Sequence, residues 1–170
     1  KRFIELSPFM VLATSRPDGL ADASPKGDHP GFVQVLDDHT VAIPDRPGNN
    51  RLDTMENLLV NPAVGLIFFI PGVNETLRIN GTAEIRDDAD LLARFEVNAK
   101  LPKTVYVVTA HEVYLHCAKA LMRSKLWAPD AQAAERPIPS IAEMMRDQAG
   151  DSVELESQAD MEARYKKLLY

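Results

Sequence analysis

The residues best suited to bind an anion lie between Arg46 and Arg51, where the sequence reads RPGNNR. This segment follows a short apolar run and precedes a stretch with helical spacing, so it would place arginine and asparagine side chains at a helix N-terminus. The first backbone N–H groups of a helix lack partners within the helix, and with guanidinium donors beside them they suit a phosphate. The other interpretation is a polar turn in which Asn50 caps the helix and the arginines are solvated.

Two further basic groups could also serve an anionic ligand. Three cations within positions 119–125 follow the end of a predicted strand and stand next to Trp127, the only tryptophan. They could hold an anionic cofactor while Trp127 covers a ring, or they could form a charged surface beside a tryptophan that anchors the core. The other group ends a strand with Ser24 and Lys26. A lone lysine beside a turn is more often solvated than bound to a ligand.

Groups for hydrolysis or metal binding are scarce. The four histidines form no HExxH motif and no pair of cysteines accompanies them, so no metal site is predicted. His116 and Cys117 are adjacent, and adjacent strand residues point to opposite faces, which argues against a Cys–His pair. Neither a nucleophile elbow nor a glycine-rich phosphate motif occurs. No catalytic side chain can be named, so any enzymatic chemistry would belong to a bound cofactor.

The composition excludes several classes of protein. A chain of 170 residues with 45% hydrophobic and 26% charged residues is typical of one globular domain with a core of its own. The 25 acidic and 19 basic residues give a net charge of −6, which argues against a nucleic-acid partner. The longest apolar run, 63–71, is too short to span a membrane. A single cysteine and the lack of a visible signal peptide predict a cytoplasmic protein.

The first two thirds of the sequence has the pattern of β-structure. Seven segments have the length and composition of strands: 8–14, 20–24, 32–36, 40–43, 63–70, 76–85 and 104–117. The first two flank a Pro-Asp-Gly turn, and they and the next two are predicted hairpins. The run 63–70 is nearly all apolar, which is typical of a strand buried on both faces, whereas 76–85 alternates and predicts one face on a core. The stretch 104–117 is either two strands or one long bent strand.

Helical spacing is short and irregular before residue 128 and dominates after it. The predicted helices are 51–60, 88–97, a segment that starts with the Ser140–Glu143 capping box, and a last stripe over 161–169. Strands at hairpin spacing with short inserted helices predict a mainly β fold, a small antiparallel barrel with a helical tail. A doubly wound α/β sheet is disfavoured because helices do not alternate with strands.

Several short motifs occur in the order of a known family. They are MVLAT at 10–14, PDG at 17–19, ASPKG at 23–27, NNR at 49–51, NPAV at 61–64 and the strand 77–85. In this order the chain resembles the pyridoxamine 5′-phosphate oxidase-like flavoproteins, split β-barrel proteins that bind FMN as homodimers. The segment 117–127 is similar to the ending of a branch of FMN-dependent enzymes. The resemblance implies an FMN-binding domain over 1–127, followed over 128–170 by a linker and C-terminal helices that pack on the barrel or the partner.

The resemblance also implies cofactor-binding residues from two subunits. One subunit would supply the phosphate loop, a strand end and the polar residue that opens a long strand: Arg46, Asn49, Asn50, Arg51, Ser24, Lys26 and Thr76. The partner's C-terminal segment would reach the flavin with Lys119, Arg123, Ser124 and Trp127. The vitamin B6 oxidase itself has Ser-Arg-Lys at the helix start and an Arg-x-His segment near its end, and this chain has neither. Pyridoxamine phosphate is therefore not the expected substrate.

We expect a homodimeric, FMN-dependent oxidoreductase that acts on a small substrate, with NADH or NADPH as a candidate electron donor. The alternative is a module on the same barrel that binds or senses a flavin or a haem without turnover. No side chain in the sequence separates these two functions. A nucleic-acid-binding barrel is disfavoured because the chain is acidic and lacks an array of aromatic residues for stacking bases.

Overall fold

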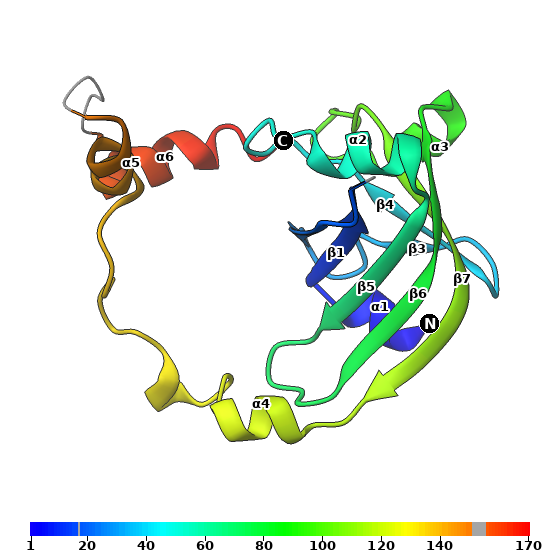
Figure 1. Cartoon of the computed structure of the whole chain (residues 1–170), viewed down its shortest axis with the longest axis horizontal. Helices are drawn as coiled ribbons and strands as arrows, with labels where there is room; N and C mark the ends of the chain where they lie inside the picture. The colour runs from blue at the N-terminus through cyan, green and yellow to red at the C-terminus, as the bar shows by residue number, and fades with distance from the viewer. Residues whose placement is uncertain (17, 151–155) are drawn as a thin grey trace.

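The computed structural model describes residues 1–16, 18–150 and 156–170 (Figure 1). Its strands form one curled antiparallel sheet in the order β2-β1-β5-β6-β7-β4-β3, which confirms the mainly β split barrel. The strands are β1 (Phe9–Ser15), β2 (Ala21–Gly27), β3 (Gln34–Val35), β4 (Thr40–Pro44), β5 (Ala63–Phe69), β6 (Thr76–Arg86) and β7 (Val105–His116). The helices are α1 (Arg2–Leu6), α2 (Asp53–Val60), α3 (Ala89–Ala93), α4 (Lys119–Ser124), η1 (Pro129–Ala131), α5 (Ile141–Ala149) and α6 (Gln158–Lys166).

Both predicted hairpins are present. Strands β1 and β2 pair from Phe9 opposite Gly27 to Ser15 opposite Ala21, so β2 continues three residues beyond its predicted end. Pro17 of the predicted turn lies outside the described residues. In the second hairpin β3 has only two residues, shorter than the predicted segment 32–36, and it pairs with β4.

The longest pairing joins β6 to β7, and it settles how residues 104–117 are arranged. They form one strand, which pairs with β6 along its whole length and shifts register by a bulge between Asn80 and Gly81. A Cβ at Gly81 would overlap the backbone carbonyl oxygen of Thr109, so only glycine fits there. The bulge bends the two strands, as bulges in barrels commonly do.

The core lies on the concave face of the sheet. Alternate residues of β6 are buried there, including Leu77, Ile79 and Ala83, as the alternation predicts. Strand β5 differs from its prediction, because burial alternates along it and only one of its faces is fully buried. An antiparallel sheet needs only one covered face, so the apolar residues on the other face of β5 are half-exposed.

Helix α2 covers one end of the barrel. The Nδ2 of its Asn57 donates to the Oγ1 of Thr14 on β1 at 2.9 Å, and both side chains are buried. The helix begins two residues later than predicted, with Leu52 as its N-cap, and no side chain caps it. The interpretation of Asn50 as the capping residue is therefore wrong. Helix α3 is also shorter than the predicted helix 88–97, ending at Ala93.

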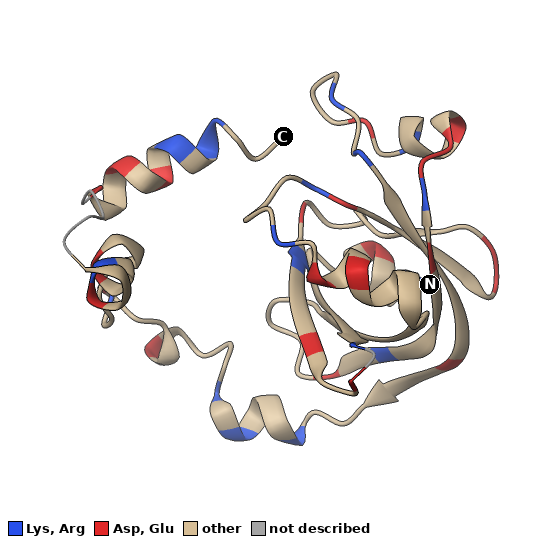
Figure 2. Cartoon of the chain, turned by 45° about the horizontal axis from the view of Figure 1, so that its top comes forward, with Lys and Arg blue, Asp and Glu red and all other residues tan. Residues whose placement is uncertain are grey.

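The segment after β7 forms a tail that arches away from the sheet (Figures 1 and 2). Helix α4 leaves the end of β7, α5 and α6 stand away from the barrel, and the chain returns to it at Tyr170. The predicted capping box is present, since the side chains of Ser140 and Glu143 each accept from the other's backbone N–H. The last helix ends at Lys166, before the apolar residues 168 and 169 of the predicted stripe. None of the helices in the described part of the chain is long and apolar enough to span a membrane.

Candidate functional site

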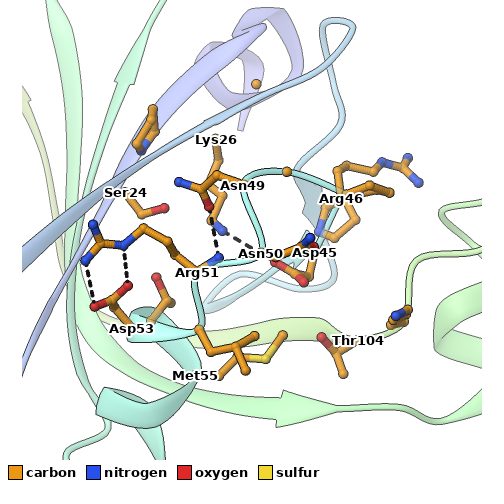
Figure 3. Close-up of a pocket in the computed structure, with 18 of the residues that line it drawn as sticks. Ser24, Lys26, Asp45, Arg46, Asn49, Asn50, Arg51, Asp53, Met55 and Thr104 are labelled. Carbon is orange, nitrogen blue, oxygen red and sulfur yellow. Dashed lines mark hydrogen bonds and ion pairs between the residues drawn. The ribbon is translucent and has the colours of Figure 1, made fainter. Parts of the chain in front are cut away.

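A pocket of about 760 Å³ opens between the end of β2, the loop after β4, the start of α2 and the residues before β7 (Figure 3). Residues that are far apart in the sequence line this one pocket. Six of the eleven cofactor-binding residues implied by the resemblance line it: Ser24, Lys26, Arg46, Asn49, Asn50 and Arg51. The structure therefore brings together the whole group that was expected around a phosphate.

The loop between β4 and α2 is shaped by its asparagines. Asn50 has a φ of 58°, a left-handed conformation that asparagine tolerates better than most residues. The Oδ1 of Asn49 accepts the backbone N–H of Arg51 at 3.1 Å, which closes a local turn just before the helix. The N-cap residue Leu52 offers no side-chain acceptor to the first N–H groups of α2, and the Asp53 carboxylate accepts the backbone N–H of its own residue, the first of the helix. A helix start of this kind attracts anions.

Arg51 is not a free cation in this pocket. Its Nε and Nη2 donate to the two carboxylate oxygens of Asp53 at 2.8 and 3.0 Å, a bidentate pair at the first residue of α2 (Figure 3). The guanidinium beside Asp53 holds the pKa of that carboxyl below its usual range. The side chain of Arg51 is still 70% exposed, so it can be reached from the pocket mouth.

Lys26 belongs to a cluster with Asp45 and Tyr106. Its Nζ lies 3.4 Å from the Oδ1 of Asp45 and 5.3 Å from the centre of the Tyr106 ring, and only 18% of its side chain is exposed. The Tyr106 hydroxyl donates to the same Asp45 oxygen at 3.0 Å. Burial, together with the Asp45 charge, raises the pKa of Tyr106 well above its usual value. Lys26 is thus a paired residue of the pocket wall and not a solvated lysine.

Arg46 is fixed into the same wall. Its Nε donates to Asp28 at 2.8 Å, its Nη1 donates to the carbonyl oxygen of Phe95 at 2.8 Å, and the ring of Tyr170 lies 5.4 Å from the guanidinium carbon. The Asp28 side chain is 1% exposed and also accepts from Tyr170 and His29. Burial acts to raise the pKa of Asp28, but these hydrogen bonds outweigh it and lower the pKa. Arg46 is therefore held in the pocket wall through its Nε and Nη1 donors.

The groups left open toward the pocket are neutral donors and one cation. Among the described residues, the Ser24 hydroxyl and the Asn50 amide make no hydrogen bond, and Lys103 at the pocket has no acidic partner. The Oγ1 of Thr104 is buried and unpaired, although it lines the same pocket. Because buried polar atoms are normally satisfied, an unpaired hydroxyl here indicates a water or a ligand group. The arrangement can bind a phosphate through hydroxyl, amide and helix N–H donors together with Arg51.

The other five implied residues do not line this pocket. Thr76 is buried where β6 begins, and α4 follows β7 at the end of the sheet opposite α2 (Figure 1). Lys119 and Arg123 on α4 are exposed, and Ser124 donates only to the carbonyl of Leu121. These five residues are Thr76, Lys119, Arg123, Ser124 and Trp127. Their contact with a flavin bound across two subunits stays a prediction.

Trp127 holds the start of the tail in place. Its Nε1 donates to the carbonyl oxygen of Val73, in the turn between β5 and β6, at 2.8 Å. Within one chain this hydrogen bond ties the tail to the β5–β6 turn, whereas Trp127 is only partly buried and is absent from the core clusters of the described residues, so it is not the core anchor considered from the sequence.

Sequence reasoning missed the acidic side of the site. Asp45 and Asp53 line the pocket and pair with its cations, and Tyr106 and Thr104 come from the start of β7 and the residue before it, next to the end of β4. The letters IPDRPG and RLD do place an acid near each arginine. That proximity was the available signal for Asp45 and Asp53, whereas Tyr106 and Thr104 depend on strand pairing.

Comparison with known proteins agrees with the fold. A family model for pyridoxamine 5′-phosphate oxidase matches residues 1–117. The structure of HupZ from Group A Streptococcus is similar with a TM-score of 0.56 and 19% identity, covering 68% of this chain and 89% of that one. A Clostridium acetobutylicum protein related to general stress protein 26 has a TM-score of 0.49 and 16% identity, covering 68% of this chain and 83% of that one. An F420 reductase has a TM-score of 0.48 and 20% identity, covering 66% of this chain and 94% of that one. No curated protein matches the chain.

Proposed function

The chain belongs to the pyridoxamine 5′-phosphate oxidase family, and on this premise we propose that it binds FMN and uses it as an oxidoreductase on a small substrate. The observation that carries the proposal is the pocket that gathers Ser24, Lys26 and the loop 46–51 around an uncapped helix start. When bound, the flavin ring supplies the hydride chemistry, and the protein supplies binding and orientation.

The residues present fit a phosphate and the polar chain attached to it. Ser24, Asn50 and Arg51 line the pocket together with the first turn of α2, so a hydroxyl, an amide, a guanidinium and a helix N-terminus lie on its wall. The unpaired Thr104 hydroxyl offers a further hydrogen bond at another part of the pocket wall. A volume of about 760 Å³ is within the usual range for small-molecule and cofactor sites.

The rest of the flavin site would come from a second copy of the chain. One pocket contains the phosphate-binding group, while Thr76 and the α4 residues lie elsewhere in the same subunit. A two-fold arrangement would let α4 of each subunit complete the site of the other, since isologous interfaces use the same surface on both subunits. We therefore propose a homodimer with the flavin at its interface.

Titration of the apo-protein with FMN and with riboflavin tests the phosphate site. We expect FMN to bind more tightly than riboflavin, and Arg51→Ala to weaken FMN about tenfold, or about 1.4 kcal/mol, without changing riboflavin binding. The loss is modest because Arg51 is exposed and already paired. Arg86→Ala is a matched control, since Arg86 forms the same bidentate pair with Asp88 outside the pocket.

The same preparation tests turnover. Bleaching of the bound flavin by NADH or NADPH, followed by reoxidation with a substrate, would support an oxidoreductase. A protein that binds flavin but is never reduced would instead indicate a binding or sensing module. Equal affinity for FMN and riboflavin would contradict a phosphate site in this pocket.

A further inference from the structure

The cations around the pocket are nearly balanced by carboxylates. Lys26, Arg46, Arg51 and Lys103 line the pocket, and so do Asp22, Asp45 and Asp53. Lys26 pairs with Asp45, Arg51 pairs with Asp53, and Arg46 pairs with Asp28 behind it, so three of these four cations have an acidic partner and Lys103 has none among the described residues. A site that bound a dianion as tightly as possible would instead leave its cations unpaired.

The Arg51–Asp53 pair differs from the other two pairs in its exposure and its position. Lys26 and Arg46 are largely buried with their partners, whereas Arg51 and Asp53 both lie at the open mouth. Asp53 is also the first residue of α2, where a negative charge interacts favourably with the helix dipole. Its carboxylate therefore uses the same guanidinium and the same helix terminus that a phosphate would use.

The pair is a local structure and needs no ligand to explain it. Arg86 and Asp88 form the same pair, with distances of 2.7 and 2.9 Å, at the start of α3. Neither of those residues lines the pocket. The sequence Arg-x-Asp before a helix thus produces the geometry by itself, and its effect on binding depends on where the pair stands.

We infer that Asp53 is a built-in competitor of the ligand phosphate, which lowers the affinity for phosphorylated ligands and makes the flavin exchangeable. This inference rests on the proposed phosphate site. A bound phosphate must draw Arg51 away from Asp53 or share it, and the carboxylate then stands beside a dianion of like charge. Since like charges at this range repel appreciably even near a protein surface, the penalty falls on FMN and not on riboflavin.

Replacement of Asp53 by asparagine tests the competition. We expect Asp53→Asn to bind FMN about tenfold more tightly than the wild type and to release it more slowly in a chase with excess free flavin. Riboflavin affinity should change less than twofold, because riboflavin carries no phosphate. Inorganic phosphate should compete with FMN at correspondingly lower concentrations in the variant.

Two controls separate competition from general effects of charge. Asp88→Asn breaks the twin pair outside the pocket, and Glu56→Gln removes another acid from the first turn of α2 without touching the pocket lining. Neither control should change FMN affinity by more than twofold. Thermal unfolding of each variant checks that the loss of an acid at the helix start has not unfolded α2.

The outcomes also separate this inference from the function on which it rests. If wild type binds FMN but Asp53→Asn binds it no more tightly, or binds riboflavin equally more tightly, the competitor role is wrong while the phosphate site stands. If neither wild type nor Asp53→Asn distinguishes FMN from riboflavin, the phosphate site itself is wrong and the inference fails with it.

Discussion

Tyr106 is a core residue that fixes the position of two charged residues of the pocket, Asp45 and Lys26. It is buried on β7, and its hydroxyl reaches Asp45 at the end of β4, which in turn holds Lys26 of β2. Three strands are thereby linked through one carboxylate. Tyr106 must keep its phenol proton to donate to Asp45, because a phenolate there would place two negative charges side by side.

We predict that this phenol makes stability fall at alkaline pH. The folded state raises the pKa of Tyr106, so the stabilisation is complete below the ordinary tyrosine pKa of about 10 and is lost as pH rises above it. The free energy of unfolding from urea titrations should decrease between pH 9 and 11 by up to about 1.4 kcal/mol per unit of pH from this group.

Tyr106→Phe should remove that part of the pH dependence and cost about 1 kcal/mol at pH 7, where Asp45 loses a donor. Tyr114→Phe, at an exposed position of β7, is the control and should leave the alkaline slope as it is. If the free energy of unfolding fell with pH equally in wild type and Tyr106→Phe, the pKa of Tyr106 would not be raised in the folded state.

At this scale the sequence predicted the donors of the site better than their partners. Lys26, Asn50 and Arg51 could be predicted to lie at one site because they occur in family-like motifs, and they do line one pocket. Their carboxylate partners could not be assigned, since Asp45 reaches Lys26 only through the packing of β2 against β4. Pairing of this kind is a property of the folded barrel and leaves no local pattern.

At the scale of elements, the pairing of β6 with β7 holds the barrel together. Their register shifts at Asn80 and Gly81, where the carbonyl of Thr109 occupies the space of a side chain. The alternation over 76–85 predicted strand β6 and its buried face, because alternation is local. The bulge was not predicted, because it depends on where β7 lies beside it.

We predict that Gly81→Ala destabilises the protein by about 1–3 kcal/mol or prevents folding, because its Cβ would meet backbone atoms of Thr109 and Ala110 that cannot move independently. Gly65→Ala on β5 is the control, since an added Cβ there meets its nearest atoms at 3.7 Å and beyond. Urea unfolding of both variants gives the comparison. A Gly81→Ala protein as stable as Gly65→Ala would mean that the strands can separate at the bulge without cost.

At the scale of the whole molecule, the tail is the feature that one subunit does not explain. It is tied to the barrel by Trp127 at one end and by Tyr170, which contacts Asp28, Arg46 and Lys100, at the other. Between them α5 and α6 have exposed apolar residues and stand away from the sheet (Figure 1). The capping box made α5 predictable, but the course of the tail depends on contacts that no local pattern encodes.

Helices of nine residues are marginal in water, so α5 and α6 need a surface to cover their apolar residues. In the proposed homodimer that surface would be the second subunit. We predict that the double change Met145→Asp and Leu168→Asp, at two exposed apolar positions of the tail, weakens the dimer at least tenfold.

Light scattering over a dilution series measures this dissociation, and Gln148→Asp is the control because it adds a charge at an exposed polar position of α5. The control should dissociate like the wild type. Flavin should be lost in step with the dimer if α4 of the partner completes the site. A double variant that dimerises as tightly as the wild type would exclude the tail from the interface, and a monomer that keeps its FMN would show that each pocket is complete in one subunit.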